Sequence, residues 1–332
     1  MYDLEGYWEA GTVEEAVQLL EDHPAAKIIC GGSDVLIKIR EGKLAGTGLV
    51  SIRGIPLLQK VTLKENGDLY IGAAMTFSHL TSHPLIRRLV PVLGEAVDQV
   101  GGPQVRNIGT IGGNICNGAV SADSAPTVFS LECRLRIEGK AGVRFSDMKS
   151  FYLGPGRVNL AQGEVLTHIV VPREKYEGYA GHYIKYSMRN AMDIATLSCS
   201  TVCKIDLKKN VLEDVKMTFG VAAAVPLRVP KTEEALKGQP LREELYGLAA
   251  GLVRQEINPR DSWRASRAFR LQIGGEIAAR SLREAVLRAR AQEEVRLRGP
   301  KQQEKVQIEA EQTGQQQEIM QPESDQHRKE VR

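Results

Sequence analysis

Two adjacent glycines near the N-terminus constrain the fold more than any other feature of the chain. An apolar run from Ala25 to Cys30 precedes Gly31-Gly32-Ser33-Asp34, and a second apolar run begins at Val35. This pattern predicts a buried strand that ends in a tight turn. Glycines lack a Cβ and tolerate positive φ, so several backbone N–H groups can converge on one anion such as a phosphate diester. A plain β-turn is the alternative for this motif alone.

A second glycine-rich stretch lies between residues 101 and 118. It contains six glycines, and among its side chains that can donate hydrogen bonds are Arg106, Thr110, Asn114 and Asn117. Neither stretch has the three spaced glycines of the dinucleotide fingerprint or the lysine of the phosphate loop. Together they predict a site for a phosphate-bearing cofactor in a fold other than the doubly wound one.

Three segments resemble the FAD loops of the flavoprotein subunits of molybdenum hydroxylases. They are Ile29–Leu36, Asn107–Ile115 and Ser121–Ser124, and the resemblance extends from the N-terminus to about residue 284. Within this family the chain is most similar to the bacterial xanthine dehydrogenase type. The two glycine pairs, about 80 residues apart, are specific for the family and less so for the substrate.

The resemblance implies an α+β fold with two domains and a tail. We expect an FAD-binding domain of two α/β subdomains, of the vanillyl-alcohol-oxidase/PCMH-like type, over residues 1–175. A smaller domain, with a three-stranded antiparallel sheet and helices, is expected over residues 180–285. Residues 286–332 are expected to be disordered or partly helical, because residues 291–332 contain ten glutamines and no aromatic side chain.

Local patterns predict the elements. Thr12-Val-Glu-Glu15 is a capping box that begins a helix, and Glu65-Asn-Gly-Asp68 is the turn of a hairpin. Residues 85–100 predict one helix, and residues 262–280 predict another on which Trp263 and Arg264 have a structural role. Further strands are expected at 131–137, 165–171, 183–186, 197–205 and 211–221, and further helices at 232–236 and 241–255.

The resemblance also implies the cofactor and its contacts. FAD is expected to bind without a covalent link, its pyrophosphate against both glycine-rich turns and its ring near Leu166 and Lys185. A cation there would stabilise the anionic reduced flavin, and a solvated strand position is the alternative for Lys185. No catalytic or metal-binding residue is expected. The expected cofactor-binding residues are Ile28, Ile29, Cys30, Gly31, Gly32, Ser33, Asp34, Val35, Gly109, Thr110, Ile111, Gly112, Gly113, Asn114, Asp123, Leu166 and Lys185.

Two charged side chains of the glycine-rich stretches have roles that follow from the residues alone. The carboxylate of Asp34 is expected to accept N–H groups of its own turn and hold the turn open. For Arg106, neutralisation of a phosphate and a solvated surface position are equally open.

Composition disfavours several other classes. The formal net charge of +3 and the lack of a basic run disfavour nucleic-acid binding. The five cysteines form no Cys-x-x-Cys pair, which favours reduced thiols over metal or iron–sulfur ligands. No apolar run approaches the roughly 20 residues that span a bilayer, and the first residues do not read as a signal peptide. A cytoplasmic location is expected.

The resemblance assigns the remaining chemistry to partners. A molybdopterin-binding large subunit would hydroxylate the purine, and an iron–sulfur small subunit with 2Fe-2S clusters would deliver the electrons. This chain would take them up on FAD and pass them to NAD+, or to oxygen. One alternative is the flavoprotein subunit of another member, acting on carbon monoxide, an aromatic acid or an aldehyde. Another is a non-catalytic nucleotide-binding or assembly module, against which the intact glycines argue.

Overall fold

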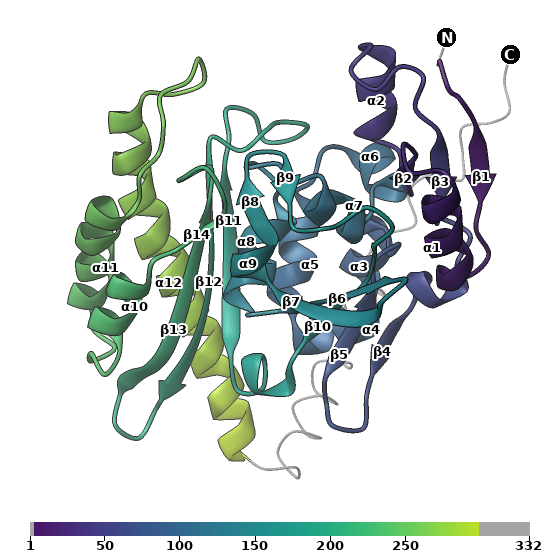
Figure 1. The fold of residues 1–332 in the computed structure, drawn as a ribbon. Helices are drawn as coiled ribbons and strands as arrows, with labels where there is room; N and C mark the ends of the chain where they lie inside the picture. Colours follow the sequence, from purple (N-terminus) through teal and green to yellow (C-terminus); the bar gives the residue numbers. More distant parts are fainter. Residues whose placement is uncertain (1–2, 299–332) are drawn as a thin grey trace, which may run out of the picture. The chain divides into compact units, whose positions relative to one another are not determined.

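In the computed structural model, which describes residues 3–298, the N-terminal part of the chain contains a three-stranded parallel sheet (Figure 1). Strand β3 lies between β1 and β2, and both neighbours run parallel to it. Helix α1 (Val13–Asp22) packs on this sheet through Val13, Ala16 and Leu20. The strands are β1 (Tyr7–Glu9), β2 (Lys27–Ile29) and β3 (Leu49–Ser51).

The predicted capping box is confirmed at the start of α1. The Glu15 N–H donates to Thr12 Oγ1 at 3.1 Å, and the Glu15 carboxylate accepts from the Gly11 N–H at 2.7 Å. This helix returns the chain to β2, which ends at the first glycine pair. The second apolar run after that pair is helix α2 (Val35–Arg40).

A five-stranded antiparallel sheet in the order β4-β5-β10-β6-β7 forms the second half of this N-terminal region. The predicted hairpin is confirmed: Gly67 has φ +85° in the turn between β4 and β5, as its Asn-Gly sequence requires. The short helix η1 precedes β4. The bounds are η1 (Pro56–Gln59), β4 (Val61–Leu63), β5 (Leu69–Gly72), β6 (Arg134–Gly139), β7 (Gly142–Asp147) and β10 (Val165–Val171).

The single helix predicted over 85–100 is wrong, because the chain breaks at Val90. Pro91 lacks an N–H group and begins a new helix instead of continuing the first. Short helices lie on both sides of this break, and two short strands and a second 3-10 helix follow later in the region. These elements are α3 (Phe77–Ser82), α4 (Pro84–Leu89), α5 (Pro91–Asp98), α6 (Pro103–Ile108), α7 (Ile111–Cys116), α8 (Ser124–Ser130), α9 (Met148–Phe151), β8 (Tyr152–Gly154), β9 (Arg157–Val158) and η2 (Arg173–Lys175).

The C-terminal region is built on an antiparallel sheet in the order β11-β12-β13-β14. Three long strands form the predicted meander, and the structure adds β14, a two-residue strand that carries little sequence signal. In Figure 1, helices α10, α11 and α12 cover one face of this sheet, and α5 and α8 lie against the other. The bounds are β11 (Ala180–Tyr186), β12 (Leu197–Asp206), β13 (Val211–Gly220), β14 (Leu227–Arg228), α10 (Pro230–Leu236), α11 (Glu243–Glu256) and α12 (Arg267–Arg298).

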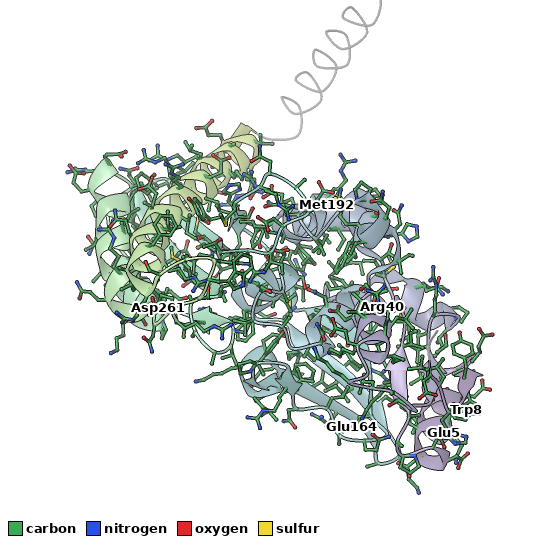
Figure 2. All side chains as sticks on the ribbon, turned by 90° about the horizontal axis from the view of Figure 1, so that it is seen from above. Glu5, Trp8, Arg40, Glu164, Met192 and Asp261 are labelled. Atoms are coloured by element: carbon green, nitrogen blue, oxygen red, sulfur yellow. The ribbon has the colours of Figure 1, made fainter. Side chains whose placement is uncertain are left out.

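The loop of residues 187–196, between β11 and β12, reaches the second glycine-rich stretch. A Cβ on Gly102 would lie 3.2 Å from the Cγ atom of Met192, so this side chain packs on the start of α6. Figure 2 shows Met192 beside helices of the N-terminal region and well apart from Asp261, which belongs to the C-terminal one. The C-terminal region therefore contacts the stretch that carries the second glycine pair.

Helix α12 differs from its prediction at both ends. It begins at Arg267, so Trp263 lies in the preceding turn and is 81% exposed, which corrects its expected position on the helix. At the other end, Val286 and Ala289 are buried in the core of the C-terminal sheet. The helix continues through Arg298, past the predicted start of the tail at residue 286, and residues 299–332 lie outside the described part.

A cluster of charged side chains around Glu132, just after the end of α8, connects the N-terminal and C-terminal regions. Glu132, in a left-handed conformation with φ +46°, accepts from Lys175 at 2.6 Å and Arg228 at 3.1 Å and lies 3.5 Å from Lys216. Burial raises the pKa of Glu132, but the three cations more than offset it and lower the pKa to about 2. Because Lys216 and Arg228 belong to the C-terminal sheet, this carboxylate holds the two regions together.

Candidate cofactor site

The two glycine-rich turns meet at Gly31. A Cβ on Gly31 would lie 2.2 Å from the carbonyl oxygen of Ile108, which is closer than real Cβ contacts come. Only glycine therefore allows the first turn to touch the end of α6. This contact brings together two segments that are about 80 residues apart in the sequence.

The first turn presents a run of backbone donors. Gly32 adopts φ +75°, which turns successive N–H groups to one side. Within residues 3–298, none of the five N–H groups from Gly31 to Val35 donates a hydrogen bond. The first N–H groups of a helix always lack an intrahelical partner, and here the unpaired run extends from the start of α2 back through the turn to Gly31, which suits an anion.

The expected role of Asp34 is wrong. Its carboxylate accepts no hydrogen bond from the turn and lies exposed at the start of α2. The turn is held open by the backbone conformation of Gly32, since the Asp34 side chain makes no contact that would do so.

The second turn uses its N–H groups internally. The Ile111 N–H donates to the Met75 carbonyl at 3.1 Å, and the Gly112 N–H donates to the Ala73 carbonyl at 2.9 Å. The Gly113 N–H donates to Thr110 Oγ1 at 3.2 Å. The second turn therefore shapes the cavity wall, and its N–H groups at 111–113 are not free to bind a phosphate.

A cavity of about 530 Å³ lies between the two turns, within the size range of ligand pockets. Thirteen expected residues line it, whereas Ile29, Ile111, Asp123 and Lys185 do not. The thirteen are Ile28, Cys30, Gly31, Gly32, Ser33, Asp34, Val35, Gly109, Thr110, Gly112, Gly113, Asn114 and Leu166.

Lys38 is the main lining residue that the sequence argument missed. Its ammonium donates to Asn117 Oδ1 at 2.7 Å, which links α2 to the end of α7 across the cavity. Its spacing from Val35 could have revealed it. On a helix that begins at Val35, Lys38 lies one turn further on, on the same face of the helix as Val35. The segment Leu160–Glu164 also lines the cavity and carries no glycine-pair signal.

Arg106 does not line the cavity. Its guanidinium lies 3.4 Å from the carboxylate of Asp98 and donates to the carbonyls of Val100 and Gly101. These contacts occupy the cation and do not favour a phosphate role.

Two cysteines of the cavity wall are held as thiols. Burial raises the pKa of Cys30, and burial raises the pKa of Cys116 to about 12. Neither forms a disulfide. Both therefore supply neutral surface to the wall at neutral pH.

Asp123 and Lys185 form a buried ion pair next to the cavity. Lys185 Nζ lies 2.8 Å from Asp123 Oδ2 and donates to the Gln99 carbonyl at 2.9 Å, and both side chains are under 10% exposed. Burial raises the pKa of Asp123, while Lys185 and the phenol of Tyr183 oppose that rise. Lys185 is therefore not the solvated strand residue of the alternative interpretation.

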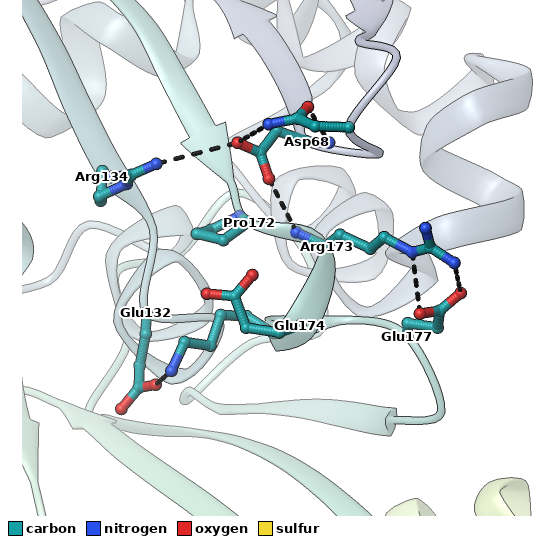
Figure 3. A pocket seen from close by; sticks show the side chains of 9 residues that line it. Asp68, Glu132, Arg134, Pro172, Arg173, Glu174 and Glu177 are labelled. Carbon is teal, nitrogen blue, oxygen red and sulfur yellow. Dashed lines mark hydrogen bonds and ion pairs between the residues drawn. The ribbon is translucent and has the colours of Figure 1, made fainter.

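A second hollow, shown in Figure 3, is a charged groove of about 480 Å³ between Asp68, Glu132 and Arg173. The side chains in it pair with one another: Arg134 with Asp68, Lys175 with Glu132, and Arg173 with Glu177. Each cation that lines the groove is already paired with a carboxylate, so the groove is less suited to a phosphate than the cavity between the turns. The groove does not compete with the cavity between the turns as a cofactor site.

Metal sites and membrane spans are both absent from the described range. Residues 3–298 contain no group of three or more His, Cys, Asp or Glu side chains able to hold a metal ion. Across that range, no helix is long and apolar enough to cross a bilayer.

Comparison with known proteins identifies the family. Residues 2–174 match the FAD binding domain in molybdopterin dehydrogenase, and residues 182–285 match the CO dehydrogenase flavoprotein C-terminal domain. The chain belongs to this family. It is an FAD-binding oxidoreductase subunit, and the donors and volume of the cavity fit that cofactor.

Individual relatives agree over most of the chain. The xanthine dehydrogenase FAD-binding subunit of Escherichia coli O157:H7 is 38% identical over 289 residues, which are 87% of this chain and 98% of that protein. The nicotinate dehydrogenase FAD-subunit of Eubacterium barkeri is 32% identical, over 74% of this chain and 83% of that one. The carbon monoxide dehydrogenase structure from Hydrogenophaga pseudoflava superimposes with a TM-score of 0.82 at 27% identity, covering 87% and 99% of the two chains.

Proposed function

We propose that this chain is the FAD-binding electron-transfer subunit of a molybdenum hydroxylase of the xanthine dehydrogenase type. The observation that carries the proposal is the run of five free N–H groups from Gly31 to Val35 at one side of the cavity. Identity of 38% to a xanthine dehydrogenase subunit, against 32% to a nicotinate dehydrogenase subunit, supports the purine-oxidising type.

The chain's own residues define how FAD would be held. The N–H groups of Gly31 to Val35 would donate to the pyrophosphate, and the Lys38 ammonium would supply the compensating charge. Leu166, buried in the wall, would provide an apolar surface for the ring. Lys185 does not line the cavity, but it donates to the carbonyl of Gln99, the neighbour of the wall residue Val100. When bound, FAD supplies the redox chemistry, and the protein supplies position and electrostatics.

The remaining site residues act through the wall or through a neighbour. Thr110 caps α7, and Asn114 accepts from Ser124 Oγ at 2.7 Å, which ties the wall to the segment that carries Asp123. Ile29 and Ile111 do not line the cavity, and Ile111 is fully buried in the core next to it.

We further propose the partners and the electron path. A molybdopterin-binding large subunit would hydroxylate the purine, and an iron–sulfur small subunit would pass the electrons to FAD on this chain. From FAD the electrons would go to NAD+. The subunit works in the cytoplasm, in keeping with five cysteines that form no disulfide. We propose residues 1–175 and 180–285 as its domains, with α12 extending the core of the second to Ala289.

The purified chain tests the cofactor assignment. We expect about one FAD per chain, released into the supernatant by acid precipitation because the link is not covalent. A colourless protein that takes up no added FAD would refute the assignment. Flavin that stays on the acid pellet would refute the non-covalent link alone.

Co-purification with both partner subunits tests the rest. Xanthine should reduce NAD+ in the complex, whereas a chain depleted of FAD should leave only the reduction of an artificial dye. Oxidation of nicotinate but not xanthine would place the chain with another member of the family.

A further inference from the structure

We propose that Tyr183 is a positioning residue for the flavin: its phenol fixes the Asp123 carboxylate that holds the Lys185 ammonium beside the cavity. This inference rests on the proposed function, because the group it positions lies beside the FAD site. Tyr183 does not line the cavity, and it acts through two other side chains.

The strand sets the geometry. On β11, Tyr183 and Lys185 are two residues apart and therefore point to the same face of the sheet. That face packs against α5 and α8 of the N-terminal region. The Tyr183 hydroxyl donates to Asp123 Oδ1 at 2.8 Å, and the Lys185 ammonium lies 2.8 Å from Asp123 Oδ2. One carboxylate is thus held by both of its oxygens from a single strand.

Both side chains of the Tyr183–Asp123 hydrogen bond are buried. Tyr183 is 1% exposed and Asp123 is 6% exposed, so water cannot replace either partner. Burial raises the pKa of the Tyr183 phenol well above its ordinary value, so the hydroxyl keeps the proton that it donates to Asp123. A buried carboxylate that lost one donor would retain the Lys185 ammonium as its remaining hydrogen-bond partner, with a larger desolvation cost.

Two short paths connect the cluster to the cavity. Lys185 also donates to the carbonyl of Gln99, the neighbour of Val100 in the cavity wall. Asp123 precedes Ser124, whose hydroxyl donates to Asn114 of the wall at 2.7 Å. A change at the Asp123 carboxylate can therefore be transmitted to the cavity wall by two routes, through Lys185 and Gln99 to Val100 and through Ser124 to Asn114.

The charge state of the Asp123–Lys185 pair should affect the reduction potential of the bound flavin. With Asp123 ionised the pair is neutral, and with Asp123 protonated the Lys185 charge is uncompensated beside the flavin. An uncompensated cation raises the reduction potential of a nearby flavin. The titratable groups that face this carboxylate are Lys185 and Tyr183 of β11, whereas Cys199 of β12 pairs with Ile184 and points to the opposite face of the sheet.

The test compares Tyr183→Phe with Tyr152→Phe. Tyr152 is also buried, but its hydroxyl has no hydrogen-bond partner in the described chain, so its removal controls for the loss of a buried hydroxyl. The midpoint potential of bound FAD is measured spectroscopically from neutral to acidic pH in the parent and both variants. We expect Tyr183→Phe to match the parent at neutral pH and to rise above it on acidification. The onset should come at a pH roughly one to two units higher than in the parent. Tyr152→Phe should follow the parent throughout.

Three outcomes decide the matter. An acid-dependent difference confined to Tyr183→Phe supports the proposal. Potentials that coincide at every pH overturn it, and so does an offset that does not change with pH, since a structural role alone would produce that. A parent chain without FAD would instead refute the proposed function.

A second measurement covers a Tyr183→Phe variant that retains no FAD. Urea unfolding of the apoproteins is followed over the same pH range. The loss of stability in Tyr183→Phe should be largest where Asp123 is ionised and should shrink as the pH falls and the carboxylate is protonated in both proteins. A loss of stability that is constant with pH overturns the proposal.

Discussion

The contact between the two turns predicts that Gly31→Ala will weaken FAD binding. The new Cβ would start 2.2 Å from the Ile108 carbonyl oxygen, so the turns must separate by about 0.8 Å to reach even 3.0 Å. Both partners are backbone, so no side chain can move aside. Overpacking of this kind costs about 1–3 kcal/mol. Displacement of the turn would also lose two charge-assisted hydrogen bonds to phosphate, at about 1.5–3 kcal/mol each.

At the lower value for each hydrogen bond, the two losses reduce the binding free energy of FAD by about 3 kcal/mol. We therefore expect the dissociation constant for FAD to rise on the order of a hundredfold or more. It is measured by titrating the apoprotein with FAD and following the quenching of flavin fluorescence. Gly42→Ala is the matched control, because Gly42 has φ +77° and nothing lies within 4 Å of the place a Cβ would take. That variant should lose about 1–2 kcal/mol of stability to backbone strain and bind FAD normally. Parent-like affinity in Gly31→Ala would refute the argument that this contact sets the phosphate donors.

Three other changes have expected outcomes. Lys38→Met should weaken FAD binding about tenfold and reduce its salt dependence, because it removes the cation of the wall, as titrations at two ionic strengths would show. Glu132→Gln should cost about 1–2 kcal/mol at neutral pH in urea unfolding. Since the folded pKa of about 2 lies below the ordinary 4.5, that loss should fade as the pH falls towards 2; a loss independent of pH would contradict the ion cluster. Deletion of residues 299–332 should leave the melting temperature and FAD content unchanged, because the described core ends at Ala289; loss of FAD would contradict this.

The elements with strong local chemistry were predictable from the sequence. The capping box at Thr12, the Asn-Gly hairpin and the turn at Gly31-Gly32 each depend on residues within four positions of one another. The alternating apolar pattern also placed the long strands of the C-terminal sheet. Such signals need no knowledge of the rest of the fold.

What the sequence did not reveal depends on contacts between distant segments. The two glycine-rich turns look alike as sequences, yet only the first keeps its N–H groups free. The N–H groups of the second turn donate to the carbonyls of Met75 and Ala73, about 40 residues earlier, and no local sequence pattern marks those hydrogen bonds. In the same way, the position of Asp34 suggested that its carboxylate accepts N–H groups of its own turn, but the side chain accepts none of them.

Helix α8 explains how the C-terminal region can influence a cofactor held by the N-terminal one. All seven of its residues are buried, and it packs against β12 and β13. Asp123 precedes it and pairs with Lys185, while Glu132 follows it and binds Lys216 and Arg228. Ion pairs from one sheet therefore hold both ends of the helix. Because Ser124 at the start of α8 also donates to Asn114 of the cavity wall, the ion pairs at both ends of the helix fix the C-terminal sheet relative to that wall.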